Sequence, residues 1–186
     1  MSFALSVLFS RSVHADSAHL FSGGLPASKV ASLNWAYYTD STYGDTIIAP
    51  AANNWNSISS KVKLSNASGT GTSVSIDAYK DTTSIPGLWG EIIPYYVDAS
   101  GNVVDDLACL CHTWTYVEVY GYENQMNTSG LTNTQKVSNY THEFGHALSL
   151  NHVARNSPSA AVMKQGQQGI GPQQTDKDHL RLKWGN

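Results

Sequence analysis

The chain has 186 residues and a net charge of −3, with 41% hydrophobic and only 13% charged residues. This composition supplies a hydrophobic core for one domain and lacks the low hydrophobicity and high net charge of disordered chains. Because no cluster of Lys and Arg is present to neutralise phosphates, and no apolar run approaches ~18 residues, we expect neither nucleic acid nor a membrane as partner.

The first fifteen residues have features of a secretory signal peptide. Residues 3–9 form a short apolar segment, and Val13-His14-Ala15 fits the small-residue pattern that precedes a cleavage site. The usual basic segment before the apolar run is missing, so an ordinary apolar strand is the alternative. We expect residues 1–15 to be a signal peptide and residues 16–186 to form a single secreted domain.

The first half of the chain predicts strands around one helix. Residues 34–39 are rich in aromatic side chains and precede turn residues, which favours a strand. Residues 46–60 carry apolar side chains at helical spacing, with Pro50 near the start, where proline is tolerated. A short extended segment follows at 61–64. Residues 72–79 alternate apolar and polar side chains, which predicts a half-buried strand.

Two further strands are predicted at 88–97 and 113–120. The loop between them, residues 98–106, is rich in side-chain oxygen atoms and could hold a calcium ion. It does not match the ligand spacing of an EF-hand, and we favour a solvated turn.

Cys109 and Cys111 are the only cysteines. A disulfide between residues two apart closes a very small ring, which predicts strain, so we favour a free or redox-labile pair. A metal clip that includes His112 is the alternative, although the paired C-x₂-C spacing of a zinc ribbon is missing.

A long helix is predicted from Asn133 to the neighbourhood of Ser149. Thr132 and Gln135 match a capping box, which sets the start. The apolar stripe that follows consists of Val137, Tyr140, Thr141, Phe144 and Leu148. His142 and His146 project to nearly the opposite side of the helix, so they are poorly explained as core residues. A short C-terminal helix is predicted to open at residues 175–178 and to carry Leu180, Leu182 and Trp184.

Residues 142–146 read H-E-x-x-H on the predicted helix. Two histidines at positions i and i+4 are about 40° and 6 Å apart, so both imidazoles can reach one zinc ion. Glu143 lies beside them, where a carboxylate can take a proton from zinc-activated water and return it to a leaving amine. This composition predicts only about 0.006 chance matches to the pattern.

The residues after Glu143 limit the choice of a third zinc ligand. No glutamate occurs after Glu143, which excludes a downstream Glu ligand. His152 remains the best candidate, with Asp176, Asp178 and His179 as weaker ones. On a continued helix His152 would lie about 120° and 9 Å from His146, so the helix must end near Ser149.

The stretch HEFGHALSLNH resembles the zinc-binding consensus of the metzincin endopeptidases, and HEFGHAL is especially similar to the matrixins. Ala161-Val162-Met163 resembles their Met-turn, the tight loop whose methionine lies beneath the zinc ligands. The resemblance implies that His142, His146 and His152 bind zinc and that Glu143 is the general base.

The sequence departs from the family pattern at three positions. Ser149 stands where the family has a helix-ending glycine, and a left-handed serine costs roughly 1–2 kcal/mol more than glycine. Asn151 tolerates that conformation better and is an alternative place for the turn. Val153 matches none of the residues that distinguish the subfamilies, and Met163 lies somewhat farther from the third histidine than in typical matrixins.

These features predict an α+β, metzincin-like catalytic domain, in which a twisted mixed sheet packs on two long helices, followed by a C-terminal helix. We expect a monomeric, secreted zinc endopeptidase whose peptide or protein substrate pairs with an edge strand within residues 88–96, where Pro94 suits an edge. Two rivals remain. One is a zinc hydrolase of another substrate, with Asp176 or Asp178 as third ligand. The other is a non-catalytic extracellular binding module that uses the ten tyrosines and five tryptophans.

Overall fold

The computed structural model describes residues 16–67, 74–166 and 169–186. The predicted signal peptide, residues 1–15, lies outside the described residues, as do the first two residues of the strand predicted at 72–79.

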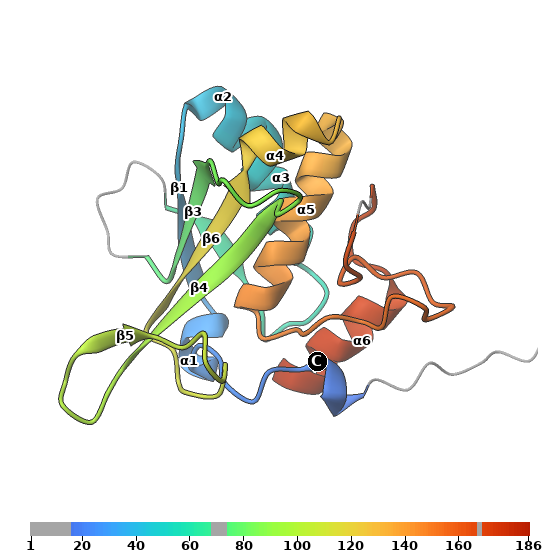
Figure 1. Cartoon of the computed structure of the whole chain (residues 1–186). Coiled ribbons are helices and arrows are strands. Elements are labelled where there is room, and N and C mark those ends of the chain that lie inside the picture. The colour runs from blue at the N-terminus through green and yellow to red at the C-terminus, as the bar shows by residue number, and fades with distance from the viewer. Residues whose placement is uncertain (1–15, 68–73, 167–168) are drawn as a thin grey trace, which may run out of the picture.

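A six-stranded mixed sheet forms one side of the molecule (Figure 1). Its strands, in spatial order, are β2 (Leu64–Asn66), β1 (Leu33–Tyr38), β3 (Ile76–Asp81), β6 (Tyr116–Tyr122), β4 (Gly90–Val97) and β5 (Val103–Asp105). The first four are parallel to one another, whereas β4 runs antiparallel to both β6 and β5. Together with the helices, this mixed sheet confirms the predicted α+β class.

The two faces of the sheet differ in chemistry. One face carries aliphatic side chains such as Ile76 and Val119, which are fully buried in the hydrophobic core. The other face carries tyrosines, among which Tyr79 stacks between Tyr38 and Tyr120 at 4.9 and 5.0 Å. The alternation places the core on one side of the sheet only, where the helices pack.

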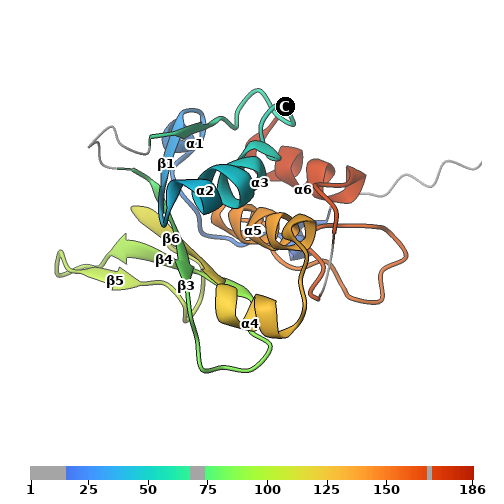
Figure 2. The ribbon, with the colours of Figure 1, turned by 90° about the horizontal axis from the view of Figure 1, so that it is seen from above.

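Two helical segments cover the core face, as Figures 1 and 2 show. The longer is α5 (Asn133–Ala147), whose start is set by the predicted capping box of Thr132 and Gln135. The other is a continuous run of α2 (Ser41–Tyr43), a π-helical turn (η2, Gly44–Ile48) and α3 (Ala49–Asn53).

The second helical segment corrects the predicted range 46–60. It begins earlier because the Asp40 carboxylate caps it by accepting the Tyr43 amide at 2.9 Å. It ends earlier because the chain turns to contact α5. Asn54 and Trp55 donate side-chain hydrogen bonds to the hydroxyl and the carbonyl of Thr141, at 2.9 and 2.8 Å. Of the extended segment expected at 61–64, only Leu64 belongs to a strand, β2.

The remaining helices are short, apart from the last. They are η1 (Ser17–His19), α1 (Ala27–Val30), α4 (Glu123–Thr128) and α6 (Gln174–Trp184). The predicted C-terminal helix is therefore confirmed. Within the residues that the structure describes, no helix combines the length and the apolarity that a membrane span requires.

The loop predicted at 98–106 contains the strand β5, and residues 98–102 form the turn of a hairpin between β4 and β5. One oxygen of Asp98 accepts the amides of Ser100 and Asn102, both at 2.8 Å, so this carboxylate closes the turn. Asp105 belongs to β5. Among the described residues, no group of three His, Cys, Asp or Glu ligand atoms gathers at the hairpin turn, and the calcium expectation receives no support.

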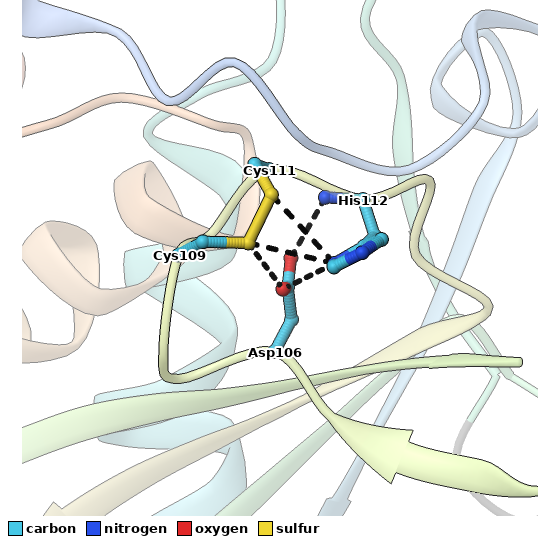
Figure 3. Close-up of side chains that lie close together, drawn as sticks. All are labelled: Asp106, Cys109, Cys111 and His112. Carbon is cyan, nitrogen blue, oxygen red and sulfur yellow. Dashed lines mark hydrogen bonds and ion pairs between the residues drawn. A yellow bond between two sulfur atoms is a disulfide. The ribbon is translucent and has the colours of Figure 1, made fainter. Parts of the chain in front are cut away.

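Cys109 and Cys111 are joined by a disulfide bond, so of the expected free or redox-labile pair the free alternative is wrong (Figure 3). The small ring closes because Leu110, between the two cysteines, adopts a left-handed conformation with φ 51°. The Leu110 amide is held by the carbonyl of Asp106 at 2.9 Å. Periodicity and composition carry no signal for such a local conformation.

Candidate active site

A cleft of about 710 Å³ lies between β4 and α5. Residues 87–92 form one wall, and α5 forms the floor with His142, Glu143 and His146. Asn151, His152 and Lys164 lie among the residues that complete the lining. The cleft thus brings the four sequence-predicted site residues together on one surface of the protein.

The end of α5 turns the chain back toward its own histidines. The amide of Ser149 donates to the carbonyl of His146 at 2.8 Å, and that of Leu150 donates to the carbonyl of Gly145 at 3.0 Å. This pair of bonds is a Schellman motif, which requires a left-handed residue after the helix. Ser149 supplies it with φ 67°, so the turn is at Ser149 and not at Asn151.

We expect the Ser149→Gly variant to be more stable than the wild type by about 1–2 kcal/mol. Glycine removes the left-handed penalty of serine, and the buried Ser149 hydroxyl has no hydrogen-bond partner among the described residues. The greater freedom of glycine in the unfolded chain offsets part of the gain. Urea unfolding measures the difference in unfolding free energy, provided that its dependence on urea concentration has the same slope in both proteins. Ser149→Ala, which keeps the Cβ atom, is the matched control. A destabilised Ser149→Gly variant would contradict this account.

The three predicted histidines converge through their Nε2 atoms. The Nε2 of His146 lies 3.0 Å from that of His142 and 3.1 Å from that of His152, and the remaining pair is 3.1 Å apart. A tetrahedral zinc ion with nitrogen ligands at about 2.1 Å spaces them about 3.4 Å apart. The observed triangle is within a few tenths of an ångström of that arrangement, so the triad could bind a metal ion.

Hydrogen bonds at the opposite ring nitrogens fix which atoms face the centre. The Nδ1 atom of His142 donates to the carbonyl of Val162 at 2.8 Å, and that of His146 donates to the carbonyl of Leu150 at 2.7 Å. Both Nε2 atoms therefore carry lone pairs when the rings are neutral. Lone pairs facing each other at 3.0 Å repel, whereas a shared cation makes the arrangement favourable, so these residues fit a metal ion.

Burial favours the neutral form of the three rings. Desolvation lowers the pKa of His142 to about 4 and lowers the pKa of His146 well below its usual value. The pKa of His152 is lowered by the same cause. Neutral imidazole is the form that binds metal ions, so the site does not have to release protons from these rings at neutral pH.

Glu143 lies against the β4 wall of the cleft. A Cβ atom on Gly90 would approach the Glu143 Cγ to 2.9 Å and the Tyr120 carbonyl oxygen to 2.7 Å, so glycine permits this contact. Desolvation, with a contribution from Glu91, raises the pKa of Glu143 to about 8. A cation at the neighbouring triad would favour the ionised form and lower that pKa again.

Met163, the methionine of the predicted Met-turn, packs against α5 at Gly145, one residue before His146. It is fully buried, and its Sδ occupies the space that a Cβ atom on Gly145 would need. The residue before it, Val162, provides the carbonyl that orients His142. Residues 162–163 therefore contact α5 closely at Gly145, where a larger residue would collide with Met163.

The weaker third-ligand candidates lie elsewhere. Asp176 is fully buried and accepts the amides of Val162, Met163 and Gln173 at 2.8, 3.2 and 2.7 Å, and burial raises the pKa of this carboxyl. Asp178 accepts the Gln174 side chain at 2.8 Å. His179 packs against His19 in a tilted ring contact, with ring centroids 5.1 Å apart. None of these three belongs to the described group of converging ligand atoms.

Sequence reasoning missed the contribution of residues 19–21. This segment pairs with the chain after α5, since the Asn151 amide donates to the His19 carbonyl at 2.7 Å. The Nδ1 atom of His19 donates to the His152 carbonyl at 2.8 Å, and Phe21 stacks on the His146 ring at 5.6 Å. The pairing joins residues about 130 positions apart, and no local pattern signals it.

No protein-family model and no curated protein matches the sequence. Among solved structures, the chain is similar to one titled "GM1 bound form of the ECX AB5 holotoxin", with a TM-score of 0.49 and 13% identity over 92% of this chain and 86% of that one. It is also similar to one titled "Structure of myroilysin", with a TM-score of 0.47 and 12% identity over 88% and 96% of the two chains. These structural similarities are too distant to indicate the function of the protein.

Proposed function

We propose that the protein is a secreted, zinc-dependent endopeptidase of the metzincin type, similar to the matrixins. The observation that carries the proposal is the convergence of three Nε2 atoms within 3.1 Å of one another, in a cleft that also contains Glu143. His142, His146 and His152 would hold the zinc ion. A bound zinc ion supplies Lewis-acid polarisation of a scissile carbonyl and lowers the pKa of water to about 7.

Glu143 performs the proton transfers. Its carboxylate accepts the proton that the attacking water releases and then donates it to the amine that leaves the cleaved bond. The buried surroundings of Glu143 strengthen this role, because burial lets a nearby positive charge act on the carboxylate with little screening.

The outer side of β4 would bind the substrate backbone. The carbonyls of Trp89 and Tyr95 accept amides from the β6 side, and that of Pro94 accepts the Asp106 amide on the opposite side. By alternation, the amides and carbonyls of Gly90 and Ile92 point away from β6. Because β5 pairs only with residues 95–97, no described strand covers this stretch, and an extended peptide can add to it.

The expectations of secretion and of a monomer remain part of the proposal. Secretion is supported by the signal-like pattern of residues 1–15 and by the disulfide, because disulfide bonds persist mainly in oxidising compartments.

Metal removal tests the proposed function. We expect dialysis against a chelator to abolish cleavage of an unstructured protein such as casein, and one equivalent of zinc per chain to restore it. Circular dichroism of the metal-free protein controls for unfolding. Full cleavage by metal-free protein would contradict the proposal, and peptide binding without any cleavage would favour the non-catalytic binding module.

A further inference from the structure

A second cluster of metal-binding side chains lies in the loop between β5 and β6. Asp106, Cys109, Cys111 and His112 each offer one ligand atom, and these four atoms all lie within 4.8 Å of one another. Figure 3 shows the carboxylate and the imidazole pointing toward the two sulfur atoms. The His112 Nδ1 lies 3.5 Å from the Cys109 Sγ and 3.7 Å from the Cys111 Sγ.

Contacts other than the disulfide fix the two non-sulfur ligands. Asp106 is only 2% exposed, and it accepts the His112 amide at 3.0 Å and the Trp114 indole nitrogen at 2.8 Å through the same oxygen. Its other oxygen lies 2.7 Å from the His112 Nδ1. The His112 ring stacks on Tyr96 at 3.8 Å. Such supporting hydrogen bonds and packing are what orient metal ligands in protein sites.

The loop backbone is also anchored independently of the sulfur–sulfur bond. The amide of Gly23 donates to the Leu110 carbonyl at 2.9 Å, and that of Gly24 donates to the His112 carbonyl at 3.1 Å. A Cβ atom on Gly23 would collide with both carbonyl oxygens, so the two segments lie in close contact. Reduction of the disulfide therefore leaves the loop attached to the domain.

We propose that reduction of the Cys109–Cys111 disulfide converts this loop into a Cys₂-His-Asp site for zinc or a similar divalent ion. A dithiol reductant supplies two electrons and two protons and is itself oxidised to a disulfide, while the two cysteines become thiols. Metal binding then releases both thiol protons, and His112 binds through Nδ1 with its own proton on Nε2. Thiolate, imidazole and carboxylate are the ligands that zinc prefers.

The disulfide form offers only the carboxylate and the imidazole, which is too few ligands for a structural zinc site. Metal binding at this loop is therefore controlled by redox state, whereas the histidine triad contains no redox-active ligand. Leu110, between the two cysteines, lines the cleft, so this loop forms part of the wall of the proposed active site.

Metal content measured before and after reduction tests the inference. The full chain is reduced with dithiothreitol, freed of reductant without oxygen, loaded with zinc, dialysed and analysed for metal per chain. We expect one more bound zinc in the reduced protein than in the oxidised protein. With cobalt in place of zinc, thiolate-to-cobalt charge-transfer absorption is expected only after reduction.

Matched variants locate the extra ion. The Cys109→Ser/Cys111→Ser double variant and His112→Ala are expected to lose it, whereas His179→Ala, outside both clusters, is expected to keep it. Equal metal content in reduced and oxidised protein overturns the inference. This holds both if the reduced loop stays folded without binding zinc and if it unfolds. An extra ion that persists in the double variant also overturns it. Because the readout is a difference, it remains interpretable if the histidine triad binds no zinc.

Discussion

Replacement of Glu143 with glutamine is expected to reduce peptide cleavage by about 10²–10⁴-fold while leaving the zinc content unchanged. Glutamine keeps the shape of the side chain beside Gly90 but cannot accept the proton of the attacking water. The three Nε2 atoms that would bind zinc are not altered. Initial rates on a fluorogenic peptide, with elemental analysis of the same samples, measure both quantities.

The loss must be separated from a folding defect. Burial penalises the ionised form of Glu143, so the neutral amide is not expected to lower the stability of the metal-free protein. Glu118→Gln makes the same chemical change on the tyrosine-bearing face of the sheet, where Glu118 accepts the hydroxyls of Tyr95 and Tyr120. This control is expected to keep its activity. A Glu143→Gln variant that cleaves at the wild-type rate would refute the proposed mechanism.

The features predicted from sequence are those set by local interactions. The start of α5 follows from the side chains of Thr132 and Gln135, which lie within one turn of the helix. The i and i+4 spacing of His142 and His146 fixes their separation once the helix forms. The end of the helix was predictable for a different reason, because His152 can join the triad only if the chain turns back.

The features missed from sequence depend on distant or conformational partners. The helix predicted at 46–60 ends early because Asn54 and Trp55 bond to Thr141, which lies on another element. The pairing of residues 19–21 with residues 149–151, which holds His152 in place, joins segments about 130 positions apart. The disulfide depends on a left-handed Leu110, a conformation for which a leucine gives no signal.

Substitutions of His152 and Asp176 are expected to have opposite effects, which separates the two assignments of the third ligand. Loss of a residue that only supports a zinc ligand weakens metal binding about 10–100-fold, so loss of a direct ligand should weaken it by more than 100-fold. We therefore expect His152→Ala to lose both zinc and cleavage. Its stability should change little without metal, because His152 is only partly buried and lies at the cleft.

Asp176→Ala is expected to show the reverse. The fully buried carboxylate accepts three backbone amides, two of them in the turn that contains Met163, and leaving these donors unpaired costs about 3 kcal/mol of unfolding free energy. At temperatures where the variant is folded, its zinc content should stay at one per chain. Asp178→Ala, at an exposed pairing with Gln174, should alter neither quantity. If His152→Ala instead retained zinc and Asp176→Ala or Asp178→Ala lost it, the third ligand would be a carboxylate and the resemblance to the metzincins would fail at its most specific position.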